Sequence, residues 1–193
     1  QKIALSAQEL NLPCYLIGGF VRDKILGRDT KDMDIVCVGD GIELAAKVAE
    51  KFTPRPEVNF FKNFGTAQIK IKFSAQEKEK IVKESDSNNT LVPSPLERGW
   101  GEAGLEIEFV GARKESYDFN SRKPAVENGT IEDDQNRRDF TINALYYDPA
   151  REEVHDYFGG VADCKKRVLR MIGDPATRYR EDPVRMLRAV RLA

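Results

Sequence analysis

The pattern of hydrophobic and polar positions in the first half of the chain predicts alternating short helices and strands. Apolar residues recur at helical spacing in three segments that end at Gly, Pro or polar clusters. The expected helices span residues 3–10, 20–26 and 41–51. Apolar or alternating runs predict strands over residues 14–17, 33–38, 58–61, 66–73 and 105–113. The run at 33–38 is apolar on both faces, as in a central buried strand.

The second half of the chain gives helix signals at two places. Thr130 and Asp133 form a capping arrangement, and acidic residues follow Thr130 where a helix dipole favours them. Asp182 at an N-cap and Pro183 at the first helical position predict a second helix that still runs at residue 193. No stop signal follows it and no initiator Met begins the chain, so we expect a fragment. Short strands are expected over residues 154–157 and 168–171.

Residues 74–104 have no periodic pattern. The segment is rich in Ser, Asn, Pro and Gly, and it separates two of the expected strands. Long aperiodic segments inside a compact domain are usually mobile or inserted loops. We therefore expect a long, partly flexible hairpin connection and assign it no chemistry.

Composition narrows the class of protein. The chain of 193 residues is 40% hydrophobic, which is enough for a core. No apolar stretch has the length of a membrane span and the N-terminus has no signal-peptide pattern, so we expect a soluble, cytoplasmic protein. Cys14, Cys37 and Cys164 contain no CxxC pair, and the first two are expected in the core. The single histidine, His155, is treated as structural or incidental.

The charge is unevenly distributed. Nine basic and three acidic residues lie between Lys165 and Arg191, a local charge of +6, whereas the total is −1 and the rest of the chain therefore carries −7. This asymmetry suggests an anionic partner near the C-terminal end. A solvated helix face would explain the same charges.

The stretch "GGFVRDKILGRDTKDMDIV" at residues 18–36 carries the candidate chemistry. Asp32 and Asp34 are two residues apart on an expected strand, so their side chains project from one face. The two carboxylates repel each other unless cations lie between them, and a pair of Mg²⁺ ions would suit such oxygen ligands and substrate phosphates. Gly18-Gly19 offers backbone N–H groups at a helix N-terminus for phosphate oxygens, and Arg22 lies one turn further on. The alternative is a turn, a helix and a strand with ordinary surface charges.

Glu106 and Glu108 repeat the two-residue spacing on a later strand. One of them could supply a third carboxylate if that strand is the neighbour of the strand with Asp32 and Asp34. Both are therefore kept as candidates on spacing alone.

Four motifs in order resemble one family. Gly18-Gly19 followed by Asp32-Met33-Asp34 is similar to the signature of the nucleotidyltransferase superfamily. The later motifs "RRDFTINAL", "DYFGGVADCKKR" and "EDPVRMLRAVR", at residues 137–145, 156–167 and 181–191, resemble the class II subgroup of CCA-adding tRNA nucleotidyltransferases and bacterial poly(A) polymerases. The resemblance covers nearly the whole chain apart from residues 74–104. It implies an α+β, polymerase-beta-like head with a mixed, mostly antiparallel sheet flanked by helices.

The resemblance also implies domains and roles. Residues 1–150 would form the catalytic head, and residues 151–193 the linker and the truncated start of a helical, nucleotide-selecting neck. Asp32 and Asp34 would hold the metals, with Glu108, which stands before an arginine as in the family pattern, as the third catalytic carboxylate. The nucleotide-binding residues would be Gly18, Gly19, Arg22, Arg138, Asp139, Asn143, Glu181, Asp182, Arg185 and Arg188. Asp182 and Arg185 are expected at i and i+3 on one helix face, where they could together read a base edge.

The implied activity is addition of CCA to tRNA 3′ ends from CTP and ATP, with Mg²⁺ as the cofactor. Two alternatives stay open: a poly(A) polymerase or partial CC- or A-adding relative, and a catalytically silent module that binds nucleotides or RNA. Because the family grips tRNA with body and tail domains that lie beyond this chain, we expect weak tRNA binding. The sequence does not indicate the oligomeric state.

Overall fold

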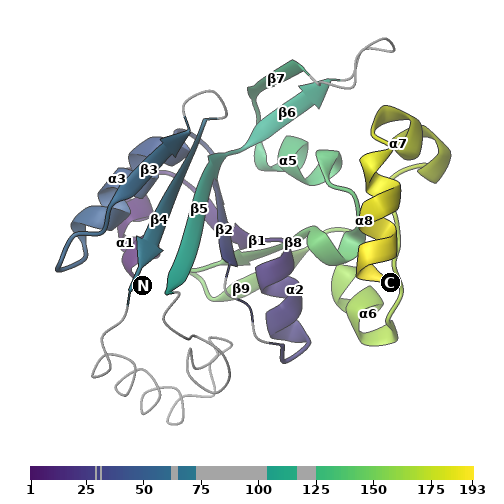
Figure 1. The fold of residues 1–193 in the computed structure, drawn as a ribbon, viewed down its shortest axis with the longest axis horizontal. Helices are drawn as coiled ribbons and strands as arrows, with labels where there is room; N and C mark the ends of the chain where they lie inside the picture. The colour runs from purple at the N-terminus through teal and green to yellow at the C-terminus, as the bar shows by residue number, and fades with distance from the viewer. Residues whose placement is uncertain (29, 31, 62–64, 73–103, 117–124) are drawn as a thin grey trace.

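The computed structural model describes residues 1–28, 30, 32–61, 65–72, 104–116 and 125–193 (Figure 1). The expected insertion at 74–104 therefore lies outside the described residues, except for Gly104. The helices are α1 (Lys2–Glu9), α2 (Gly19–Ile25), α3 (Gly41–Glu50), α5 (Ile131–Arg137), α6 (Gly160–Lys166), α7 (Pro175–Glu181) and α8 (Val184–Leu192), with a 3₁₀ turn at Thr141–Asn143. The strands are β1 (Cys14–Ile17), β2 (Asp32–Cys37), β3 (Val58–Phe61), β4 (Thr66–Ile71), β5 (Leu105–Gly111), β6 (Arg113–Ser116), β7 (Ala125–Asn128), β8 (Leu145–Asp148) and β9 (Glu153–Asp156).

A mixed sheet of seven strands forms the centre of the fold. Its strand order is β3-β4-β5-β2-β1-β8-β9, and β6 and β7 form a separate ribbon. Among the described strands of this sheet, β2 and β5 are parallel and the other neighbouring pairs are antiparallel. The expected α+β class with a mostly antiparallel mixed sheet is thus confirmed.

Helices α1, α2 and α3 cover one face of the sheet. Alternate residues of the strands, such as Leu16, Ile35 and Phe109, point to this face and pack with Leu44 and Val48 of α3 in the main core. The period of two places every second strand residue under the helices and the residues between them on the opposite face. The main hydrophobic core therefore lies between the sheet and these three helices.

The opposite face of the sheet divides into an apolar part and an acidic part. Val36, Ile17 and Tyr146 form a small buried cluster there, and Ile131 of α5 packs against it. By the same alternation, Asp32, Asp34, Glu106 and Glu108 share this face on β2 and β5. The strand expected to be buried on both faces is therefore buried at its C-terminal end and carries its carboxylates at its N-terminal end.

Helices α6, α7 and α8 lie on the right of the view in Figure 1, and apolar residues of α6 and α8 pack against the main core. Helix α7 begins at Asp174, whose side chain accepts a hydrogen bond from Thr177 N–H at 2.8 Å, with Pro175 in the first turn. The peptide chain then passes Asp182 and Pro183 into α8.

Most expected elements of the first half are present within a residue or two, and Thr130 caps α5 through the expected capping box with Asp133. Three expectations for the second half need correction. The strand expected over 168–171 is wrong: Met171 makes an isolated bridge with Phe140. Helices α6 and α7 and strands β6, β7 and β8 were not anticipated. Pro183, not Asp182, occupies the N-cap position of α8, although the Asp182 carboxylate accepts a hydrogen bond from Val184 N–H at 3.1 Å.

The cysteines confirm a simpler expectation. Cys14 and Cys37 are buried in the core, as expected, and burial raises the pKa of each thiol to about 12. Within the described ranges, none of the helices combines the length and the apolar character that a membrane crossing requires.

Phe109 on β5 provides a test of the core. Its side chain is fully buried (0% exposed), whereas Phe60 on the edge strand β3 is 49% exposed. We expect Phe109→Ala to lower the free energy of unfolding by about 3–5 kcal/mol, because it removes a large buried ring and leaves a cavity. Phe60→Ala is the matched control and should cost less than about 1 kcal/mol. Urea unfolding followed by circular dichroism measures both, and similar losses for the two variants would contradict this assignment of the core.

Candidate active site

Gly18 lies at the centre of the candidate site. It is the N-cap of α2 and has a positive φ of 69°. A Cβ added to Gly18 would lie 3.7 Å from Asp34 Oδ2, 3.9 Å from Arg138 Nη1 and 4.0 Å from the carbonyl oxygen of Asn143. The glycine thus brings together three residues that are far apart in the sequence. A side chain at this position would strain the backbone and occupy the space between a carboxylate and a guanidinium.

The carboxylates of β2 and β5 form two rows. The parallel register pairs Asp32 with Glu106 and Asp34 with Glu108. Glu106 is engaged within the sheet: it accepts a hydrogen bond from Gln68 at 3.2 Å and pairs with Lys70 at 2.8 Å. Glu108, the carboxylate favoured by the family pattern, instead lies beside Asp34 in the register.

Electrostatics distinguish Asp34 and Glu108 from ordinary surface carboxylates. Burial raises the pKa of Asp34, Arg138 opposes this shift and Asp32 adds to it. Burial likewise raises the pKa of Glu108, Asp34 adds to the shift and Arg113 opposes it. The raised pKa values thus come mainly from burial, and a neighbouring carboxylate adds to each shift.

This donor set fits a hard divalent cation. Carboxylate oxygens are the ligands that Mg²⁺ prefers, and a cation would offset both the burial and the like charges that raise the pKa values of Asp34 and Glu108. Within the described residues, the side chains are not already gathered into a group of three or more His, Cys, Asp or Glu that could hold a metal. The residues available for a metal are Asp32 and Asp34, with Glu108 as the nearest third carboxylate by register.

Arg138 is held by a buried aspartate that the sequence analysis did not single out. Asp134 is fully buried (0% exposed), and Asp134 Oδ2 accepts hydrogen bonds from Arg138 Nη2 at 2.8 Å and from the Tyr146 hydroxyl at 2.7 Å. Arg137 Nε donates to Asp134 Oδ1 at 2.8 Å. Burial alone would raise the pKa of Asp134. Arg138, Arg137 and the Tyr146 hydroxyl together lower this pKa by more than burial raises it, so the net shift is downward. The charged carboxylate of Asp134 therefore holds the guanidinium of Arg138 in place beside Gly18.

Arg22 is less available than the sequence suggested. Arg22 Nε and Nη2 donate to the two oxygens of Asp23, each at 2.9 Å, and Nη1 donates to Asn143 Oδ1 at 2.8 Å. The structure thus joins two predicted nucleotide-binding residues, Arg22 and Asn143, in direct contact. Asp23, which the sequence analysis did not single out, fixes the orientation of the guanidinium.

Asp139 and Arg188 also meet. Asp139 Oδ1 accepts the Phe140 N–H at 2.8 Å, and Arg188 Nε of α8 lies 2.5 Å from Asp139 Oδ2. That oxygen is buried and accepts no well-aligned hydrogen bond in the structure, so the Arg188 contact is an ion pair rather than a directed hydrogen bond. Asp139 Oδ2 is therefore buried and already paired with a guanidinium.

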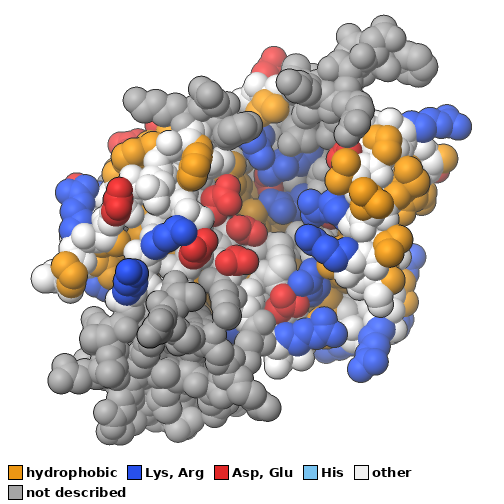
Figure 2. Space-filling model, in the orientation of Figure 1, with side chains coloured by type: hydrophobic (Ala, Val, Ile, Leu, Met, Phe, Trp, Pro, Cys, Tyr) orange, Lys and Arg blue, Asp and Glu red, His pale blue; other side chains and the backbone are white. Residues whose placement is uncertain are grey.

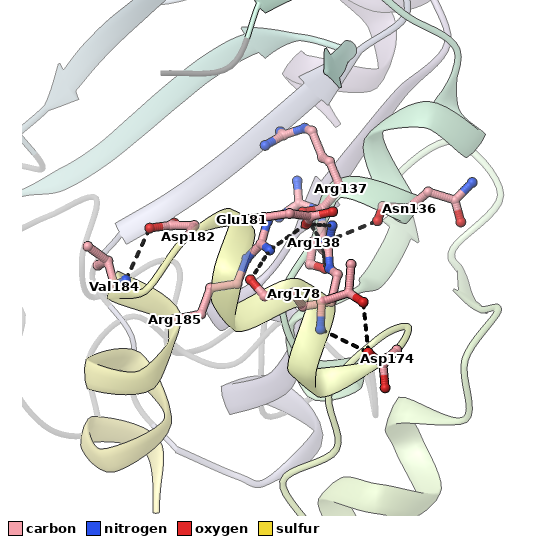
Figure 3. A network of polar contacts seen from close by, with 10 residues as sticks. Asn136, Arg137, Arg138, Asp174, Arg178, Glu181, Asp182, Val184 and Arg185 are labelled. Atoms are coloured by element: carbon pink, nitrogen blue, oxygen red, sulfur yellow. Dashed lines mark hydrogen bonds and ion pairs between the residues drawn. The ribbon is translucent and has the colours of Figure 1, made fainter. Parts of the chain in front are cut away.

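The expected placement of Asp182 and Arg185 on one helix face is wrong. Arg185 is buried (4% exposed), and its Nη1 donates to Glu181 Oε2 at 3.0 Å and to the Arg178 carbonyl at 2.8 Å (Figure 3). Asp182 stands between α7 and α8, not inside a helix, and caps Val184. The i, i+3 face argument failed because α8 begins at Val184, two residues after Asp182.

The two kinds of charge face each other across the molecule. Figure 2 shows Asp and Glu side chains gathered near the middle of this face and Lys and Arg on the side of α5 to α8, with the surface hollowed between them. The positive side corresponds to the excess of basic residues that the sequence showed between Lys165 and Arg191. Such an arrangement can hold a triphosphate between metal cations bound by the carboxylates on one side and the arginines on the other.

One signal could have revealed Asp134 from the sequence. Arg137 and Arg138 follow it at i+3 and i+4, the spacing of helix ion pairs. The acidic first turn of α5 was instead attributed as a whole to the helix dipole. Tyr146 gave no comparable signal, because its strand β8 was not expected.

This combination of a glycine turn, carboxylates on adjacent strands and facing arginines is that of a nucleotidyltransferase. Residues 14–170 match the family model described as "Poly A polymerase head domain". The chain therefore belongs to this family of nucleotidyltransferase enzymes, which includes CCA-adding enzymes and poly(A) polymerases.

Two curated relatives show the range of the family. The chain is 36% identical over 185 residues to the A-adding tRNA nucleotidyltransferase of Aquifex aeolicus, which covers 94% of this chain and 18% of that protein. It is 35% identical over 196 residues to poly(A) polymerase I of Salmonella typhi, covering 100% of this chain and 36% of that protein. The chain thus spans well under half the length of these relatives.

Solved structures agree with the fold. A tRNA-processing enzyme with CTP superposes with a TM-score of 0.70 at 33% identity, covering 99% of this chain and 40% of that chain. A tRNA nucleotidyltransferase complexed with a primer tRNA and an incoming ATP analog gives a TM-score of 0.69 at 33% identity, covering 99% of this chain and 44% of that chain.

Asp134 makes a prediction about stability and pH. Because the pKa of its folded carboxylate is lowered, the charged group stabilises the fold above its unfolded pKa, near ~3.9, and this contribution is lost as the pH falls through the folded value. We expect Asp134→Asn to cost about 3 kcal/mol at neutral pH, since it leaves the two arginines without their buried partner. The difference from wild type should shrink below about pH 4.

Denaturant unfolding at several pH values measures this effect. Glu132→Gln, an exposed acidic residue of the same helix, is the matched control and should behave like wild type. A loss of stability for Asp134→Asn that is the same at every pH would show that the lowered pKa of Asp134 has no role.

Asp34 makes a prediction about metal binding. Its raised pKa means that the charged carboxylate disfavours the fold at neutral pH and that this cost disappears as the pH falls through the folded pKa. Without divalent ions, Asp34→Asn should therefore be at least as stable as wild type. Mg²⁺ at a hundredfold excess over its Kd should stabilise wild type by about 2.7 kcal/mol and the variant much less. Thermal unfolding with and without Mg²⁺ decides, with the exposed Glu153→Gln as control; equal Mg²⁺ responses for Asp34→Asn and wild type would exclude Asp34 as a ligand.

Proposed function

We propose that the protein adds CCA to tRNA 3′ ends, using CTP and ATP as substrates. The observation that carries this proposal is the meeting of Gly18, Asp34 and Arg138. A Cβ added to Gly18 would lie 3.7 Å from Asp34 Oδ2 and 3.9 Å from Arg138 Nη1. The similar structures support it, because one contains CTP and another contains a primer tRNA with an ATP analog. Weak binding of tRNA by these residues alone remains part of the proposal.

Asp32 and Asp34 would hold Mg²⁺, with Glu108 as the third carboxylate. When bound, the metal would lower the pKa of the primer 3′-hydroxyl and neutralise charge on the triphosphate. The primer 3′-hydroxyl would attack the α-phosphorus in line, forming the new phosphodiester bond and releasing pyrophosphate.

The remaining residues would bind the nucleotide. Arg138 and the backbone N–H groups at Gly18-Gly19 would hold the phosphates, because Arg138 is charged, fixed by Asp134 and close to Gly18. Asp139, which is ion-paired with Arg188, would contact the nucleotide. Arg22 would act mainly through its hydrogen bond to Asn143, and Arg188 through Asp139.

Base selection would belong to residues 181–185, from the end of α7 to the start of α8. Glu181 holds Arg185 in place, and Asp182 precedes the first turn of α8. A carboxylate acceptor and a guanidinium donor can together match the Watson–Crick edge of cytosine or adenine. We assign residues 1–150 to the catalytic head and 151–193 to the linker and the start of this selecting neck.

A poly(A) polymerase is the second candidate. The observation that favours it is the similarity to poly(A) polymerase I, at 35% identity, which is nearly equal to the 36% identity with the A-adding enzyme. The residues proposed to hold metal and triphosphate would serve either reaction. The two candidates differ in the RNA they extend and in whether CTP is used.

A transfer assay tests the function. We expect the intact protein, with Mg²⁺, to extend tRNA that lacks its 3′ end with both CTP and ATP. Asp32→Ala should slow transfer by about a thousandfold, because metal stabilisation of the transition state contributes several kcal/mol. Glu43→Gln, exposed on α3, is the matched control and should transfer at the wild-type rate.

The other outcomes assign the alternatives. Polymerisation of ATP alone on generic RNA would identify a poly(A) polymerase. Magnesium-dependent nucleotide binding without any transfer would identify a binding module, and unchanged transfer by Asp32→Ala would overturn the metal assignment.

A further inference from the structure

Arg178 of α7 contacts the end of α5 and the start of the base-selecting segment with one side chain (Figure 3). Its Nη2 donates to the carbonyl oxygens of Arg138 at 2.7 Å and Arg137 at 2.8 Å, and it lies 3.4 Å from that of Asn136. Its Nη1 donates to Glu181 Oε2 at 2.9 Å. The side chain is 13% exposed, so these contacts are largely shielded from water.

The contacts with α5 act where a helix most needs a partner. The last carbonyl groups of an α-helix lack intrahelical donors, and the negative end of the helix dipole favours a cation there. Arg178 supplies both a donor and a positive charge to the residues that end α5. One of these residues is Arg138, whose guanidinium lies beside Gly18.

The contacts with the neck fix the other half of the site. Glu181 Oε2 accepts hydrogen bonds from both Arg178 and Arg185, and Arg185 also donates to the carbonyl oxygen of Arg178 at 2.8 Å. The buried Arg185 is thus positioned by the backbone of Arg178 and by the carboxylate that Arg178 holds. Moving the Arg178 side chain would release Glu181 and the end of α5 together.

We propose that Arg178 is a positioning residue that sets the distance between the base-selecting residues and the triphosphate-binding Arg138. This proposal rests on the proposed nucleotide-binding roles of Arg138 and Arg185. A nucleoside triphosphate has a limited span between its base and its phosphates, so it binds well only when both groups of residues are in register. Arg178 maintains this register and makes no contact with the nucleotide itself.

The test compares Arg178→Ala with Arg180→Ala, an exposed arginine on the same helix. The first readout is amide hydrogen exchange of residues 136–140 in the intact protein. In Arg178→Ala the carbonyls at the end of α5 lose their donor, so this end should fray and its amides should exchange faster. In Arg180→Ala the exchange should stay at the wild-type level.

The second readout is the binding preference for CTP and ATP over UTP and GTP, measured at equilibrium with Mg²⁺ present. We expect this preference to fall about tenfold in Arg178→Ala, the size of effect of one charge-assisted hydrogen bond. A purely structural role would lower the melting temperature without changing the ratio of affinities. If Arg178→Ala does not fold, Arg178→Lys carries the test, because one ammonium group keeps the charge but cannot bridge Glu181 and the carbonyls.

Unchanged exchange at residues 136–140 in Arg178→Ala would overturn the proposal. Raised exchange in this variant together with a base preference within about twofold of wild type would also overturn it. The third contrary result is a wild-type protein without any base preference. A wild-type protein that prefers CTP and ATP but transfers neither would refute the proposed function alone. The effect of Arg178→Ala on that preference would still decide the role of Arg178.

Discussion

The arrangement of the site depends on the buried carboxylate of Asp134. Its two oxygens accept hydrogen bonds from Arg137, Arg138 and the Tyr146 hydroxyl, and so join α5 to strand β8 of the sheet. A buried charge without partners would cost several kcal/mol, so these donors cannot leave independently. The guanidinium of Arg138 thereby has a fixed place beside the glycine turn before any nucleotide arrives. Preorganised charges of this kind need little rearrangement when a phosphate binds.

Opposite Arg138, the carboxylates of Asp34 and Glu108 are only partly balanced by positive charge in the free protein. Asp34 and Glu108 are placed next to each other by strand register, and burial raises the pKa of each. Asp32 adds to the shift of Asp34, and Asp34 adds to that of Glu108. One side of the site is thus electrostatically satisfied in the free protein, and the other side is satisfied only when cations are added. A nucleotide that arrives with Mg²⁺ would bring the cation that the carboxylates lack and the phosphates that Arg138 can bind.

The sequence predicted the local features of this site better than its long-range contacts. The period of two on residues 32–37 placed both aspartates on one face, and the glycine turn before α2 was expected. The distinction between Glu106 and Glu108 depends on strand β4, because its Lys70 and Gln68 engage Glu106; no spacing in the sequence shows that neighbour. Helix α7 has few apolar residues and no periodic pattern, so its contacts with α5 were not foreseen. The error at Asp182 came from a helix start displaced by two residues, which changes the faces of all residues near it.

The parallel pairing of β2 with β5 restricts how this protein can vary. Both strands send alternate residues to opposite faces, so the carboxylates of Asp34 and Glu108 share a face only while the register is kept. One inserted or deleted residue within β5 would turn Glu108 toward helix α3 and expose the ring of Phe109. Connections between strands can change length at small cost in free energy. Insertions and deletions among related heads should therefore accumulate in the connections, while β2 and β5 change by substitution alone.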